Sequence, residues 1–107
     1  MPLNPTLDLD SMRLRTIVRP SRIFYLREGF TLDVDPMSDE IMRVGHPLLP
    51  VSGYGPSLEV ALAEFEEMFE VQWVALVEDP HWQLAPDALR ARENFQYLVV
   101  KRARLDP

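Results

Sequence analysis

The sequence predicts an α+β fold: a small antiparallel sheet of three to four strands packed by one long amphipathic helix, with a second C-terminal helix. Short segments rich in β-branched and aromatic residues, separated by turn residues, occupy residues 12–54. From residue 58 onward, apolar residues recur three and four positions apart, which indicates a helix. The 107 residues suit a single domain that spans residues 1–107.

The N-terminal quarter predicts an arm followed by two strands. Residues 1–11 hold two prolines and two aspartates, so we expect a flexible N-terminal arm. Residues 12–18 alternate apolar and polar side chains and then become continuously apolar, which predicts a strand. Arg19-Pro20-Ser21-Arg22 breaks this strand. The β-prone run at residues 23–26 predicts the next one.

The middle of the sheet is predicted from turns and alternation. Residues 27–29 are expected to close a hairpin, because Gly29 supplies the positive φ that short loops need. Residues 30–35 alternate cleanly and predict a half-buried strand with one wet face. Residues 36–39 then read as a loop, and residues 40–45 as a further strand in preference to a helical turn.

Prolines restrict the last strand before the long helix. Pro47 and Pro50 bracket two leucines, so this piece is not expected to be a central strand. Residues 51–54 form a short strand candidate, and Gly55-Pro56 turns the chain.

The long helix is predicted to begin after Ser57 and to end near Glu78. Ser57 is a good N-cap, and Glu59 places a negative charge in the first turn. One apolar stripe consists of Leu58, Leu62, Phe65, Phe69, Trp73 and Leu76.

Residues 71–77 are apolar on nearly all sides, which leaves two interpretations of this helix end. Their β-branched content favours a strand, whereas the absence of a turn signal after Glu70 favours a continuing helix. We predict helix, with its apolar end buried against another chain.

The second helix is predicted to begin at Pro86, after a connector at residues 81–84. Its apolar face consists of Ala88, Ala91, Phe95 and Leu98. The basic residues at 101–104 are expected to complement the end of this helix. A closing strand at residues 95–100 is the alternative.

Charge is segregated along the chain, whose formal net charge is -6. Residues 1–27 carry five arginines against two aspartates, residues 28–79 carry twelve acids and one base, and the remainder carries five bases against three acids. We expect the basic ends to fold back and neutralise the acidic middle. The alternative is an acidic face that binds a basic partner. The net charge argues against simple nonspecific binding to nucleic acid.

No pattern predicts catalysis, a cofactor or a metal. Without cysteine, thiolate nucleophiles and thiolate metal sites are excluded. His46 and His81 lie outside known metal-ligand spacings and read as exposed loop histidines. Asp33, Asp35 and Asp39 lack the glycine and closing glutamate of an EF-hand loop. We therefore predict that the protein is not an enzyme. An enzyme that uses either histidine with nearby acids is the remaining alternative.

The chain begins without a basic segment and a long apolar run, so a signal peptide is not expected. Its apolar stretches are shorter than a membrane span, and the predicted location is the cytoplasm.

The segment that opens the long helix resembles the N-terminal domain of HicB-type antitoxins. That family has a turn of the form Gly-x-[Ser/Thr]-x-Glu-Glu-Ala-Leu, which Gly55, Ser57, Glu59, Ala61 and Leu62 match, whereas Val60 departs from it. The similarity covers about residues 23–73. It implies a partial ferredoxin-like sheet, self-association and inhibition of a small basic ribonuclease toxin. The residues after Pro80 are too few for the DNA-binding module that the family commonly adds.

The leading functional prediction is a non-enzymatic, HicB-like protein-interaction module that forms a homodimer and offers an acidic face to a basic protein. The predicted partner interface consists of Glu66, Glu67, Glu70, Val71, Trp73, Val74 and Val77. The alternative is a nucleic-acid-binding regulator that uses the basic N-terminal strand, with Arg13, Arg15, Arg19 and Arg22 as contacts.

Overall fold

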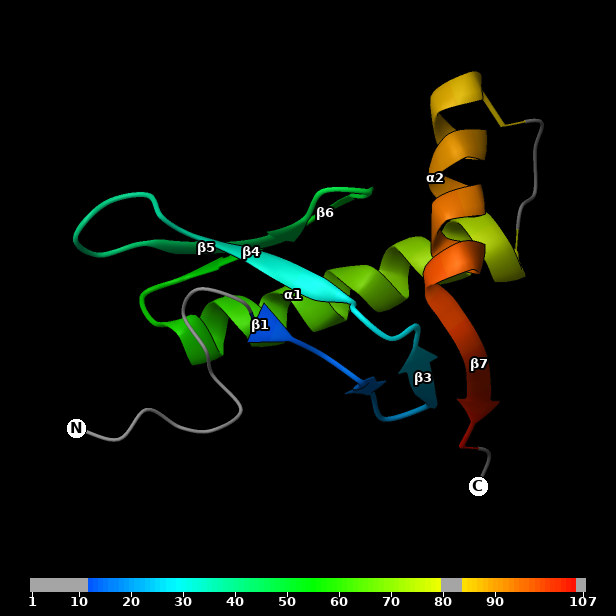
Figure 1. The fold of residues 1–107 in the computed structure, drawn as a ribbon, viewed down its shortest axis with the longest axis horizontal. Helices are drawn as coiled ribbons and strands as arrows, with labels where there is room; N and C mark the ends of the chain where they lie inside the picture. Colours follow the sequence, from blue (N-terminus) through cyan, green and yellow to red (C-terminus); the bar gives the residue numbers. More distant parts are fainter. Residues whose placement is uncertain (1–11, 80–83, 106–107) are drawn as a thin grey trace.

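Two antiparallel sheets and two helices make up the fold (Figure 1). The computed structural model describes residues 12–79 and 84–105. In chain order the elements are β1 (Met12–Arg13), β2 (Thr16–Val18), β3 (Arg22–Leu26), β4 (Thr31–Pro36), β5 (Met42–His46), β6 (Leu49–Gly55), α1 (Leu58–Trp73), the π-helical turn η1 (Val74–Glu78), α2 (Pro86–Leu98) and β7 (Val99–Arg104).

The predicted α+β class is confirmed, and the four-stranded sheet corresponds to the one expected from the sequence. Its strand order is β1-β4-β5-β6. The three-stranded sheet, with order β2-β3-β7, was not predicted as a separate unit. It exists because the C-terminal segment returns to pair with β3, a contact between residues far apart in the sequence that no local pattern encodes.

A continuous two-stranded ribbon joins the two sheets. Residues 12–18 pair with β3 in the small sheet and with β4 in the large one. A tight turn closes the ribbon where the N–H of Arg19 donates to the carbonyl of Arg22 over 2.8 Å. The ribbon crosses between sheets at residues 14–15, where the N–H of Leu14 donates to the carbonyl of Phe30.

The predicted hairpin at residues 27–29 is wrong, although its glycine is correctly placed. Gly29 has a φ of 86°, as expected for a short loop. However, β3 and β4 do not pair with each other, because both pair with residues 12–18. Residues 27–29 instead bulge out of the ribbon and carry the chain from one sheet to the other. A bulge of this kind re-aims the side chains around it.

Helix α1 covers the inner face of the large sheet, as its apolar stripe predicts. Leu32, Val44 and Val51 on the strands and Phe65 and Phe69 on the helix are all buried. The helix approaches β6 most closely at Gly53, where an added methyl group would overlap the backbone of Ala61 and Phe65. Ser57 caps the helix, accepting a hydrogen bond from the N–H of Val60 over 3.3 Å. The predicted strands at residues 30–35, 40–45 and 51–54 correspond to β4, β5 and the edge strand β6.

The apolar segment 71–77 is helical, which decides between the two interpretations left open by the sequence. The helix continues from α1 into η1 and ends at Asp79. Trp73 is only 7% exposed and contacts Phe24 edge-to-face, with ring centroids 5.4 Å apart. Val74, Leu76 and Val77 pack against the core of their own chain. This internal packing accounts for the apolar character of the segment.

The prediction that residues 101–104 end the second helix is wrong. Helix α2 starts at Pro86 as expected, but it stops at Leu98 and the chain continues as β7. Val99 and Val100 are β-branched, and the backbone of residues 99–104 pairs with β3. The alternative of a closing strand is therefore correct in kind, although that strand begins at Val99.

Two predictions, the N-terminal arm at residues 1–11 and the connector around His81, concern segments outside the described residues. Within the part of the chain that the structure describes, no helix is long and apolar enough to cross a membrane.

Candidate functional site

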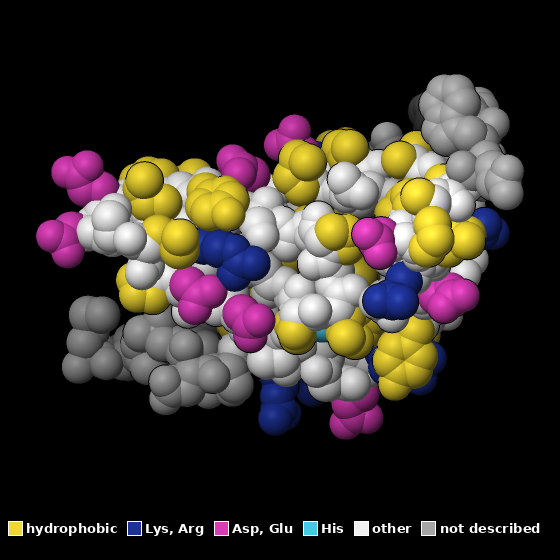
Figure 2. Space-filling view, turned by 90° about the horizontal axis from the view of Figure 1, so that it is seen from above, with side chains coloured by type: hydrophobic (Ala, Val, Ile, Leu, Met, Phe, Trp, Pro, Cys, Tyr) yellow, Lys and Arg dark blue, Asp and Glu magenta, His cyan; other side chains and the backbone are white. Residues whose placement is uncertain are grey.

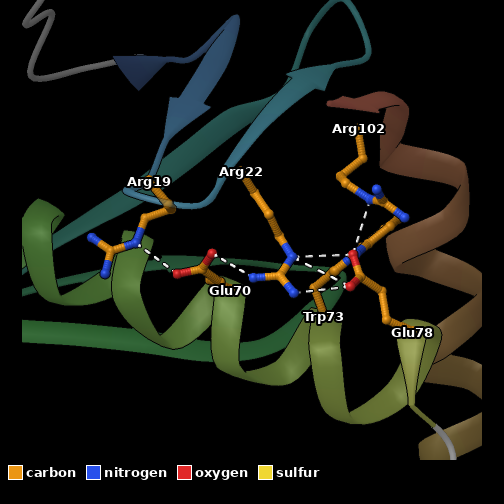
Figure 3. Close-up of polar contacts among 6 residues, drawn as sticks. All are labelled: Arg19, Arg22, Glu70, Trp73, Glu78 and Arg102. Atoms are coloured by element: carbon orange, nitrogen blue, oxygen red, sulfur yellow. Dashed lines mark hydrogen bonds and ion pairs between the residues drawn. The ribbon is translucent and has the colours of Figure 1, made fainter. Parts of the chain in front are cut away.

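Five charged side chains form one ion-pair network at the end of α1 (Figure 3). They come from segments distant in sequence: the β2–β3 turn and β3, the helix α1 with η1, and β7. The members are Arg19, Arg22, Glu70, Glu78 and Arg102. The network thus joins both basic ends of the chain to its acidic middle, as the charge pattern predicts.

Glu78 is the centre of this network. Arg22 donates to both of its carboxylate oxygens, with Nη2 3.0 Å from Oε1 and Nε 3.2 Å from Oε2. The Nε of Trp73 donates to Oε2 over 2.7 Å, and the Nε of Arg102 forms an ion pair with the same oxygen at 2.9 Å. Arg102 Nε is buried there without the alignment of a hydrogen bond. The forked contact with Arg22 is the arrangement that best orients a carboxylate.

Glu70 extends the network along α1. Its two oxygens lie 3.1 Å from Nε of Arg19 and 3.1 Å from Nη1 of Arg22. The guanidinium of Arg22 therefore lies between the carboxylates of Glu70 and Glu78 and bridges them (Figure 3). The side chain of Arg22 is 14% exposed and that of Glu78 is 12% exposed, so water screens their attraction only in part.

These contacts shift the pKa values of Glu78 and Arg22. Burial alone would raise the pKa of Glu78, but the hydrogen bonds from Arg22 and Trp73 and the charges of Arg22 and Arg102 outweigh burial and lower it. The hydrogen bond to Glu78 raises the pKa of Arg22 despite partial burial. Both groups are therefore charged at neutral pH, and their arrangement serves to hold the fold together.

The structure divides the predicted nucleic-acid contacts into two pairs. Arg22 is bound to two carboxylates within the network, whereas Arg19 uses only its Nε there, on Glu70. Arg13 and Arg15 are exposed at the crossover between the sheets. Sequence reasoning grouped the four because they alternate along the chain, but the ribbon changes sheets between the two pairs.

The predicted partner interface is likewise split. Glu70 belongs to the network, Trp73 is buried, and Val74 and Val77 pack against the core. Glu67 is exposed and Val71 is 51% exposed. Glu66 is half-buried, and burial raises its pKa although the charge of Arg19 opposes this shift.

The outer face of α1 therefore carries a different set of exposed residues from the one predicted. Helical spacing places them on the side of α1 turned away from the sheet: Glu59, Val60, Ala63, Glu67, Met68 and Val71. Glu64 is also exposed, but its carboxylate accepts a hydrogen bond from the N–H of Tyr54 on the edge strand β6. The sequence signal for this set is the position of each residue relative to the buried stripe at Ala61, Phe65, Phe69 and Trp73.

His46 is not the exposed loop histidine that the sequence predicted. It ends β5, is 8% exposed, and its ring lies 4.5 Å from the ring of Phe30. Its Nδ1 accepts a hydrogen bond from the N–H of Leu48 over 3.1 Å, which assigns the ring a structural task in the β5–β6 turn. Burial lowers its pKa, although the charge of Asp33 opposes the shift. Among residues 12–79 and 84–105, no three His, Asp or Glu side chains are grouped to hold a metal.

Sequence reasoning missed three residues of these sites. The sequence predicted only that Glu78 ends a helix and that Arg102 follows one. Their ion pair was missed because it forms only when β7 pairs with β3. Arg27 was assigned only to a turn. Its Nε donates to the carbonyl of Tyr97 over 2.7 Å, and its guanidinium lies 4.2 Å from the centre of the Tyr97 ring. No local pattern places Arg27 beside α2.

No protein-family model matches the chain, and neither a curated protein nor a solved structure matches it. Its function is therefore argued from the geometry of its own residues.

Proposed function

We propose that this protein is a non-enzymatic interaction module whose helix α1 binds a basic protein partner through its outer face. The observation that supports the proposal is the division of the acids between two sides of the helix. Glu70 and Glu78 are held by arginines of the same chain, whereas Glu59 and Glu67 are exposed. Exposed carboxylates of this kind steer a basic surface toward the helix and set its orientation.

Apolar side chains between these acids supply the contact area for such a partner. Val60 is 47% exposed, Met68 36% and Val71 51%. Burying such side chains is the favourable term in most protein association, whereas exposed charges add mainly specificity and rate. On the face seen from above in Figure 1, the hydrophobic side chains of the described residues lie in groups among acidic and basic ones (Figure 2).

The resemblance to HicB-type antitoxins extends this proposal. It implies that the chain self-associates and that its basic partner is a small ribonuclease toxin. The apolar residues of η1 pack against their own core, so the proposed homodimer would form through a sheet edge and not through the helix end. Light scattering after size-exclusion chromatography measures this directly, and a strict monomer would contradict the dimer.

A capture experiment tests the partner surface. The tagged protein, as wild type and as the Glu59→Gln/Glu67→Gln variant, is co-expressed with any short basic protein that a neighbouring gene encodes. We expect the wild type to copurify the basic protein and the variant to lose most of it, because both substituted carboxylates face outward. The melting temperature should fall only slightly. Neither residue belongs to the ion-pair network, and losing the Glu59 charge from the first turn of α1 costs at most about 1 kcal/mol.

The matched control removes the same charge from another surface. Asp33→Asn/Asp39→Asn changes two exposed acids on β4 and on the turn that follows it. This control should retain the partner. Equal loss of capture in both double variants would mean that net charge, and not the α1 face, attracts the partner. Undiminished capture by the α1 variant would refute the proposed surface.

A further inference from the structure

A basic hollow of about 400 Å³ lies at the crossover between the two sheets. Its walls come from the crossing strand, with Arg13, Leu14 and Arg15, and from the bulge at Leu26–Gly29. The ribbon geometry brings these walls together, because the N–H of Leu26 donates to the carbonyl of Arg15 and the N–H of Leu14 to that of Phe30. Three arginines thus line one hollow with a single acidic residue, Glu28.

These arginines have guanidinium N–H donors that are free to bind an anion. Within the described residues, neither Arg13 nor Arg15 forms a hydrogen bond or ion pair through its side chain, and both are exposed. Arg27 uses its Nε on the carbonyl of Tyr97. A guanidinium carries five N–H donors, so the terminal nitrogens of Arg27 are still able to bind an anion. Stacking on Tyr97 fixes the position of this group beforehand.

A second hollow of about 300 Å³ shares the bulge as a wall. Its other lining is largely apolar and includes Phe30, Leu48, Tyr97 and Leu98. Tyr97 is 57% exposed and Leu48 is 47% exposed, so their faces are open to a ligand. Figure 1 shows the β3–β4 connection beside the end of α2, which is where the two hollows adjoin.

We propose that the paired hollows bind a nucleotide unit, either free or within a single-stranded nucleic acid. The phosphate lies among Arg13, Arg15 and Arg27, and the base lies against Leu48 and the face of the Tyr97 ring that Arg27 does not cover. Guanidinium groups match phosphate geometry, and a flat ring beside an aromatic side chain is the usual platform for an unpaired base. An acidic peptide would use the basic hollow but would leave the apolar one without an occupant. This site shares no residue with the α1 face, so it stands or falls independently of the proposed function.

The experiment is a titration at low salt with adenosine monophosphate, a short single-stranded oligonucleotide, inorganic phosphate and a polyglutamate peptide, followed by backbone amide shifts. We expect the nucleotide or the oligonucleotide to shift the amides of Gly29 and Tyr97 and to bind more tightly than phosphate. Binding by the oligonucleotide alone assigns a nucleic-acid site, and equal binding of both assigns a site for free nucleotides. For the oligonucleotide, one bound phosphate predicts a slope of about −0.7 for the logarithm of affinity against that of salt.

Single-residue variants locate the site. Arg15→Gln should weaken binding by roughly tenfold, the effect of losing one charge-assisted hydrogen bond. Glu28→Gln should strengthen it by roughly two- to fivefold, because the one carboxylate in the hollow repels phosphate. Arg104→Gln is the control: it removes an exposed arginine on β7 and should leave the affinity unchanged.

Four results would overturn the proposal. They are the absence of binding by both nucleotide probes at low salt, an affinity unaffected by Arg15→Gln, phosphate binding as tight as that of the nucleotide, and polyglutamate binding as tight as that of the oligonucleotide. The third would remove the role of the apolar hollow, and the fourth would assign the site to acidic peptides. Each variant changes an exposed side chain, so unchanged melting temperatures confirm that folding is intact.

Discussion

At the scale of single residues, two partly or fully buried polar side chains, Glu78 and His46, make contacts that the sequence did not predict. Glu78 and His46 read from the sequence as a helix terminator and an exposed loop residue. The structure places both in contact networks that involve distant residues. Their distant neighbours are Arg22 on β3, Arg102 on β7 and Phe30 just before β4, and the local sequence around Glu78 and His46 gives no sign of these contacts.

These two groups predict how stability depends on pH. Burial lowers the pKa of His46, so below about pH 6.5 the unfolded chain binds a proton that the folded chain resists. The contacts of Glu78 lower its pKa as well, so a second loss begins below about pH 4.3. We therefore expect the free energy of unfolding to fall in two steps as the pH decreases. Chemical denaturation at a series of pH values measures both.

Variants assign each step of the pH profile. His46→Gln should remove the step below pH 6.5 and Glu78→Gln the step below pH 4.3, each leaving the other in place. Glu66 acts in the opposite direction, because its raised pKa adds stability at low pH that is lost as the pH rises. A His46→Gln profile that has the same slope as the wild-type profile between pH 7 and 5 would contradict the burial of His46.

Gly53 makes a separate prediction about packing. Gly53→Ala should destabilise the fold by about 1–3 kcal/mol, because its methyl group meets helix backbone that cannot move alone. Gly45→Ala is the matched control, since its methyl group meets the end of the flexible Arg43 side chain, which can swing away into water. Thermal or chemical denaturation compares the two. Equal losses would show that α1 does not approach β6 as closely as described.

At the scale of elements, the sequence predicted what local patterns determine and missed what long-range pairing determines. The cap at Ser57, the alternation in β4 and the left-handed Gly29 are local, and all were correctly placed. The bulge at residues 27–29 and the conversion of the α2 end into β7 depend on partners elsewhere in the chain. Of the candidate interface, only the part set by helical periodicity was predictable.

The π-helical turn η1 is the element that positions Glu78. In an α-helix residues five apart do not face each other, but the wider turn brings Glu78 beneath the Trp73 indole. Deletion of the exposed Ala75 should restore α-helical geometry and rotate Glu78 out of the network. We expect a loss of about 1–3 kcal/mol, the cost of leaving partly buried arginines unpaired.

A background variant shows whether this loss comes from the network. In the Glu78→Gln chain the deletion of Ala75 should cost clearly less, because the contact it disrupts is already gone. Full additivity of the two changes in chemical denaturation would mean that η1 stabilises the fold by another route.

At the scale of the whole molecule, the segregated charges of the sequence form ion pairs that close the chain, because they join its basic N-terminal and C-terminal parts to its acidic middle. Arg22 from the basic N-terminal part and Arg102 from the basic C-terminal part meet on Glu78 from the acidic middle. These ion pairs neutralise Glu70 on α1 and Glu78 on η1. They leave Glu59 and Glu67 exposed, and these two acids are the basis of the proposed partner surface. The charge pattern predicted the closure, but it did not indicate which acids would be used.

The most direct test of this closure is a double-mutant cycle between Arg22 and Glu78, measured as free energies of unfolding. The exposed pair Asp35–Arg43, 3.0 Å apart on the large sheet, is the internal control and should couple by less than about 1 kcal/mol. For Arg22→Gln and Glu78→Gln, we expect a coupling energy of about 1–3 kcal/mol. Additivity within about 0.5 kcal/mol would contradict the account, because it would mean that Glu78 does not hold the two ends of the chain together.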